Sequence, residues 1–141
     1  MKIVLFEGVD KTGKSTLAKA FNKATKYQHL VIDRLFLSQY AYALSYHRHI
    51  VEEELDRLFY HMKPDLVIVY VCADKEIIER RLSISNHEKI HLDRDLASFD
   101  KALHKFDEMG SNIFVVDTSE ELPKTHVKRI VDYVQKLELQ S

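Results

Sequence analysis

Apolar residues recur along the chain in two alternating patterns, which predict strands separated by helices. Nearly continuous apolar runs predict buried strands at 2–7, 29–34, 65–72 and 112–117. Apolar residues at helical spacing predict helices at about 14–26, 38–62 and 92–109, one after Asp74 and a last one from Pro123. Strands that alternate with helices favour a parallel sheet with helices on both faces. We therefore predict a three-layer α/β/α fold with a parallel sheet of about four strands.

The segment 83–92, SISNHEKIHL, follows neither pattern and is predicted to be a mobile loop. It lies within a chain of 141 residues whose composition, 45% hydrophobic and 30% charged, is typical of one soluble globular domain, 1–141. In an open parallel sheet, ligands bind at the carboxyl ends of the strands. We therefore expect the mobile loop, Asp33, Asp117 and the turn after the first strand to lie together at that edge.

Charge and cysteine content narrow the possible partners and compartments. The 21 basic and 22 acidic residues nearly cancel, so bulk charge gives no reason to expect binding to nucleic acid or to a membrane. The single cysteine, Cys72, excludes an internal disulfide and suits a reducing compartment. No apolar stretch has the length of a membrane span, and the chain begins directly with a strand rather than a signal peptide. These features predict a cytoplasmic protein.

The strongest motif lies at 3–16, IVLFEGVDKTGKST, where an apolar strand runs into Gly-x-x-x-x-Gly-Lys-Ser. Its glycines allow a sharp turn that points backbone N–H groups inward, and a helix that starts at Lys14 adds its positive end. Lys14 is predicted to contact the β- and γ-phosphates of a nucleotide, and the Ser15 hydroxyl to bind Mg²⁺. The predicted phosphate-binding residues are Gly8, Val9, Asp10, Lys11, Thr12, Gly13, Lys14, Ser15 and Thr16.

A second pair of charged residues follows the second predicted strand. Asp33 ends this strand, which we expect to lie beside the first one. Its carboxylate could hold Mg²⁺, directly or through water, or accept a proton from an attacking group. Arg34 could bind the phosphate of an acceptor. Spacing alone also allows a surface Asp and Arg that cap the following helix.

These motifs resemble those of a known family. The segment FEGVDKTGKST resembles the opening of thymidylate kinases, F-E-G-x-D-x-x-G-K-[ST]-T. The segment DRLFLSQYAY is similar to the D-R-x-x-x-S-x-x-A-Y of that family and places Asp33, Arg34, Ser38, Ala41 and Tyr42 at its fixed positions. KPDLVIVYVCADKEIIERRL, LDRDLASFDKALHKF and FVVDTS resemble later segments of the family, in the same order.

The resemblance implies a P-loop kinase-type fold and Mg²⁺-dependent transfer of the γ-phosphoryl group of ATP. Lys14 and the loop backbone would bind the donor phosphates, and Arg80 or Arg81 would lie over the donor. Lys11 stands where one branch of the family has a catalytic arginine in the loop. The segment 83–92, which corresponds to the family's lid, contains no arginine. The resemblance therefore implies catalytic roles for Lys11 and Lys14.

On the acceptor side, the resemblance implies a deoxynucleoside monophosphate. Asp10 matches the loop acid that contacts the acceptor's sugar hydroxyl in the family, and Arg34 matches the arginine that binds the acceptor phosphate. Ser38 and Tyr42 belong to the same motif and would lie in the acceptor site. Asp33 would contribute to catalysis by holding Mg²⁺.

One departure from the family leaves the acceptor open. Thymidylate kinases insert a strand ending in Thr-Arg-Glu-Pro and two helices before the Asp-Arg strand, where this chain has only TKYQ, residues 25–28. A kinase of nucleosides or of 5′-hydroxyl ends of nucleic acid, with Asp33 as general base, is the first alternative. A module that binds ATP without catalysis is the second. The expected partners are ATP and a small nucleotide; a nucleic acid end and a homodimer stay open, and no membrane is expected.

Overall fold

The computed structural model describes residues 1–84, 91–120 and 123–140. Its strands are β1 Ile3–Glu7, β2 Leu30–Asp33, β3 Leu66–Cys72 and β4 Asn112–Asp117. Its helices are α1 Lys14–Ala24, α2 Phe36–Tyr46, α3 Glu52–Met62, α4 Lys75–Ile84, α5 Leu92–Glu108 and α6 Pro123–Leu139, and a 3₁₀ turn at Lys63–Asp65 precedes β3. The strands form one parallel sheet in the order β2-β1-β3-β4. The predicted α/β fold with a parallel four-stranded sheet is confirmed.

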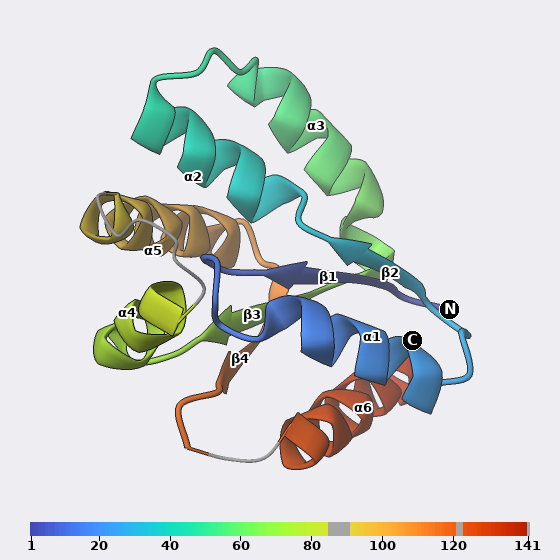
Figure 1. Ribbon diagram of the computed structural model, residues 1–141. Helices are drawn as coiled ribbons and strands as arrows, with labels where there is room; N and C mark the ends of the chain where they lie inside the picture. The colour runs from blue at the N-terminus through green and yellow to red at the C-terminus, as the bar shows by residue number, and fades with distance from the viewer. Residues whose placement is uncertain (85–90, 121–122, 141) are drawn as a thin grey trace.

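The sheet lies between two layers of helices (Figure 1). Helices α1 and α6 cover one face, where Phe21 and Ile130 pack against Val69 of β3. Helices α2, α3, α4 and α5 cover the other face, where Phe36 and Phe106 belong to the cluster around Ile68. Because successive strand residues point to opposite faces, β3 contributes apolar side chains to both layers. This double burial explains its continuous apolar run.

The predicted single helix over 38–62 is wrong, because the structure has two helices, α2 and α3, in this region. His47 adopts a left-handed conformation with φ of 52°, which ends α2, and Val51 is extended. The next helix opens with Glu52, Glu53 and Glu54 in its first turn. Carboxylates are stabilised at a helix N-terminus, so three of them in a row favour a new start at this point.

The predicted mobile loop at 83–92 is shorter at both ends than expected. Ser83 and Ile84 form the last residues of α4, and Leu92 is the first residue of α5. Residues 85–90, which make up most of the predicted lid, lie outside the described residues. The expectation that this segment is mobile stays a prediction.

A short connection joins α1 to β2, in the place of the larger insertion of thymidylate kinases. The chain turns at Lys26 and Tyr27, both left-handed with φ of 55° and 59°, and enters β2 three residues later. β2 is an edge strand of the described sheet, and Leu30 is 48% exposed. In the described part of the chain, no helix has the length and apolarity that crossing a bilayer requires.

Gly8, directly after β1, is fixed by the close approach of β3. Its φ of 142° lies in a region that residues with a side chain rarely adopt, and a Cβ atom at this position would overlap the carbonyl oxygen of Val71. Gly13 also has a positive φ, 87°, but a Cβ there would lie 4.0 Å from the nearest side-chain atom, on Thr118. Close packing therefore requires the first glycine, whereas backbone conformation alone favours the second.

Gly8→Ala and Gly13→Ala should differ in their cost to stability. Gly13→Ala should lower the free energy of unfolding by about 1–2 kcal/mol, the cost of a left-handed residue. Gly8→Ala adds an overlap with the backbone and should cost at least about 3 kcal/mol. Urea unfolding of both variants and the wild type checks this, and equal free energies for the two variants would contradict it.

Candidate functional site

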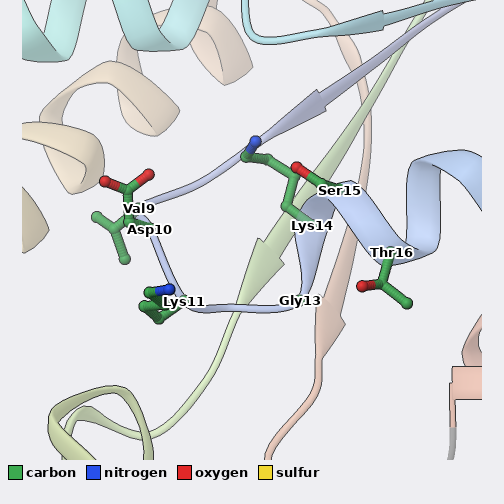
Figure 2. A pocket seen from close by; sticks show the side chains of 7 residues that line it. All are labelled: Val9, Asp10, Lys11, Gly13, Lys14, Ser15 and Thr16. Carbon is green, nitrogen blue, oxygen red and sulfur yellow. The ribbon is translucent and has the colours of Figure 1, made fainter. Parts of the chain in front are cut away.

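The segment between β1 and α1 wraps around an open pocket of about 460 Å³ (Figure 2). The residues that line it are Val9, Asp10, Lys11, Gly13, Lys14, Ser15 and Thr16. Lys11, with φ of 65°, and Gly13 are both left-handed, and α1 starts immediately afterwards. Thr12 steadies the turn, because its hydroxyl donates to the Val9 carbonyl at 3.0 Å. The N-terminal end of a helix, with its unpaired N–H groups, thus opens onto a concave loop, an arrangement suited to anions.

Lys14, Ser15 and Asp33 meet at the carboxyl ends of β1 and β2. The parallel register pairs Phe6 with Asp33, which brings the Asp33 carboxylate to the start of α1. One carboxylate oxygen forms an ion pair with the Lys14 ammonium, and the other accepts a hydrogen bond of 2.9 Å from the Ser15 hydroxyl. The Lys14 side chain is only 7% exposed. The structure therefore brings together the three residues that the sequence assigned to donor phosphates and metal.

These contacts set the charge state of Asp33. Partial burial raises the pKa of its carboxyl, but the hydrogen bonds from Lys14 and Ser15 and the charges of Lys14 and Arg34 lower it more, so the pKa lies below its ordinary value. The carboxylate is ionised at neutral pH and forms an ion pair with the Lys14 ammonium. A phosphate that binds Lys14 must replace or share this carboxylate.

The Ser15 hydroxyl and the Asp33 carboxylate also fit Mg²⁺. Both are hard oxygen donors and lie 2.9 Å apart, and Ser15 lines the pocket where a phosphate would supply further oxygens. Mg²⁺ usually takes one or two protein ligands and completes its shell with water and phosphate. Across residues 1–84, 91–120 and 123–140, no group of three or more His, Cys, Asp or Glu side chains is placed to hold a metal alone.

Arg34 lies beside the loop and contacts the residues that were predicted to bind the acceptor. One of its terminal nitrogens, Nη2, donates to Asp10 at 2.6 Å, and Nη1 donates to the Ser38 hydroxyl at 3.1 Å. Its guanidinium carbon lies 5.3 Å from the centre of the Tyr42 ring and 6.0 Å from that of Phe99. Burial raises the pKa of Tyr42 to about 12, so its hydroxyl stays neutral. The sequence did not single out Phe99, although it lies in a segment that resembles the family.

Arg81 contacts the far side of the loop. It donates to the Lys11 carbonyl at 2.8 Å and to the Thr118 carbonyl at 3.2 Å. Thr118 in turn donates through its hydroxyl to the Thr12 carbonyl at 2.5 Å. Arg80 is exposed and makes none of these contacts. Of the two arginines that the sequence offered, Arg81 is therefore the one placed at the loop.

A second pocket, of about 200 Å³, adjoins the loop beside Arg81. Two of its lining residues, Thr118 and His126, were not predicted as site residues from the sequence. Its lining consists of Thr12, Gly13, Thr16, Leu17, Arg81, Thr118, Pro123 and His126. His126 is 3% exposed, and its Nε2 atom has no hydrogen-bond partner within the described residues. Thr118 follows Asp117, so its place at the end of a strand is the only local signal for it. The sequence gives no local signal for His126, because a histidine on the apolar face of a helix is often only a packing residue.

If Asp33 competes for Lys14, neutralising it should strengthen the binding of inorganic triphosphate in the absence of metal. Asp33→Asn frees the ammonium and removes a negative charge, so we expect affinity to rise about fivefold in EDTA. Lys14→Ala should reduce it by at least as much. Calorimetric titration measures both. Asp117→Asn, the same charge change at the exposed end of β4, is the matched control, and an equal gain in that variant would contradict the competition.

Comparison with known proteins shows likeness in structure only. No protein-family model matches the chain, and no curated protein resembles it in sequence. Among solved structures, it is similar to the YorR protein from Bacillus subtilis, crystallised in complex with phosphorylated GDP, with a TM-score of 0.84 and 21% sequence identity. The alignment covers 99% of each chain. The two proteins therefore share their fold over nearly the whole chain.

Proposed function

We propose that the protein is a Mg²⁺-dependent nucleotide kinase that transfers the γ-phosphoryl group of ATP to a deoxynucleoside monophosphate. The observation that carries the proposal is that two cations, Lys14 and Arg34, lie near one carboxylate, Asp33, at the end of β2. Lys14 binds Asp33 from the loop, and Arg34 follows Asp33 directly along the chain. Phosphoryl transfer depends mainly on bringing two phosphates together and neutralising their charge. At this edge of the sheet, Lys14 and Arg34 would each bind one phosphate and neutralise part of its charge.

On the donor side, the loop pocket would hold the triphosphate. Lys14 and the N–H groups at the start of α1 would contact the β- and γ-phosphates, and Mg²⁺ would bind Ser15 and Asp33. The pocket beside Arg81 lies next to Gly13, where the donor's base could be held. The nucleotide bound to YorR, which has the same fold, supports a nucleotide as the ligand.

On the acceptor side, Arg34 would bind the phosphate that receives the phosphoryl group. Its guanidinium has N–H donors beyond the two groups that Asp10 and Ser38 use, so a phosphate could bind without loss of either contact. Asp10, which is exposed, would meet the acceptor's sugar hydroxyl, as the resemblance implies. Lys11 and Lys14 would stabilise the charge that develops during transfer. No general base is needed, because the acceptor phosphate is already ionised.

A hydroxyl kinase is the second candidate, and the open edge of the sheet favours it. Among the described residues no strand lies outside β2, and Asp33 at its end is exposed, so a nucleoside or a 5′-hydroxyl end of nucleic acid could approach. Asp33 would then accept the proton of that hydroxyl. The contacts with Lys14 and Ser15 weigh against this candidate, because they lower the pKa of the carboxyl and so make it a weaker base.

A panel of acceptors with labelled ATP and Mg²⁺ should separate these functions. We expect turnover with deoxynucleoside monophosphates and none with nucleosides or 5′-hydroxyl oligonucleotides. In the Asp33→Asn variant, extra Mg²⁺ should then restore part of the rate, because the residue serves the metal. A general base contributes roughly 10²- to 10⁴-fold, and added metal would not replace it. Turnover on hydroxyl acceptors alone, with an Asp33→Asn defect that Mg²⁺ does not change, would refute the proposal.

A further inference from the structure

Glu7 is a fully buried carboxylate at the end of β1, immediately before the loop. It accepts hydrogen bonds from the start of α2. Its Oε2 atom accepts from the backbone N–H groups of Leu37 at 2.6 Å, Leu35 at 3.2 Å and Ser38 at 3.3 Å. Its Oε1 atom accepts from the Ser38 hydroxyl at 2.5 Å. Burial raises the pKa of the Glu7 carboxyl, whereas the hydrogen bonds from the Ser38 hydroxyl and from the N–H groups of Leu35, Ser38 and Leu37 lower it in part. These donors at the N-terminus of α2 offset part of the cost of burying the group.

The hydroxyl of Ser38 extends this network to the acceptor side. A serine hydroxyl has one proton and two lone pairs. Because its only proton goes to Glu7, the Ser38 oxygen presents its lone pairs to Arg34, whose Nη1 group donates to it at 3.1 Å. The carboxylate thus fixes the direction in which the hydroxyl accepts. The backbone contacts are enough to cap α2, and the Ser38 hydroxyl adds a contact that also reaches Arg34.

We propose that Glu7 is a positioning residue, which sets the orientation of Arg34 through the Ser38 hydroxyl and so prepares it for the acceptor phosphate. The inference rests on the proposed function. Glu7 directly precedes Gly8, the first residue of the loop. The strand that carries the donor loop therefore also holds the acceptor arginine, and one buried carboxylate fixes the two phosphate sites relative to each other.

Ser38→Ala is the direct test, because it removes the hydroxyl link and leaves the backbone bonds to Glu7 in place. Arg34 loses one hydrogen bond, so the KM for the acceptor should rise about five- to tenfold, while the KM for ATP changes less than about twofold. Ser45→Ala is the matched control. Ser45 is buried in the same helix, and its hydroxyl donates to Ser98 at 2.8 Å, not to Arg34.

A second measurement keeps the test independent of turnover. In arginine side-chain NMR spectra, the rotation rate of the Arg34 guanidinium reports whether hydrogen bonds hold it in one orientation. We expect faster rotation in Ser38→Ala and in Glu7→Gln, whose amide would present a proton to the Ser38 oxygen, and no change in Ser45→Ala. If Ser38→Ala matches Ser45→Ala in rotation or in acceptor KM, the inference is wrong. Absence of wild-type turnover on every monophosphate would instead refute the proposed function, and the spectra would still decide whether Glu7 and Ser38 hold Arg34.

Discussion

The arrangement of the site depends on the parallel register between β1 and β2. Phe6 pairs with Asp33, and its carbonyl accepts the N–H of Arg34 at 3.0 Å. Successive strand residues point in opposite directions. In this register the Asp33 carboxylate therefore points toward Lys14, and the next residue, Arg34, points toward Asp10 and Ser38. A slip of one residue would reverse the two. A single peptide bond therefore separates Asp33, for which we propose a role toward the donor, from Arg34, for which we propose a role toward the acceptor.

Two buried ionisable groups at this edge of the sheet make contacts of different kinds. Glu7 and Lys14 are both buried, and each has a partner that offsets the cost of removing it from water. The partners differ in kind. Glu7 binds the fixed N-terminus of α2, whereas Lys14 binds the Asp33 side chain, which a ligand can replace. The first contact joins two elements of the fold, and the second is the contact that a phosphate would replace in the proposed function.

The sequence revealed those parts of the structure that local signals determine. The strands and the loop at 8–16 follow from continuous apolar runs and glycine spacing. The break between α2 and α3 was missed because the apolar spacing continues across the left-handed His47. Long-range contacts could not be predicted in the same way. The bond from Arg81 to Lys11 joins residues 70 positions apart, and the bond from Ser38 to Glu7 joins residues 31 apart, so both require the folded sheet.

The proposed function requires that the loop between β1 and α1 binds the phosphates of a nucleoside triphosphate. Calorimetric titration of the wild-type protein with ATP and Mg²⁺, repeated in the presence of inorganic triphosphate, measures this binding. We expect a single site whose apparent affinity for ATP falls in proportion to the triphosphate present, because both ligands need Lys14 and the start of α1. Binding of ATP that triphosphate leaves unchanged, or no binding of ATP, would contradict the account.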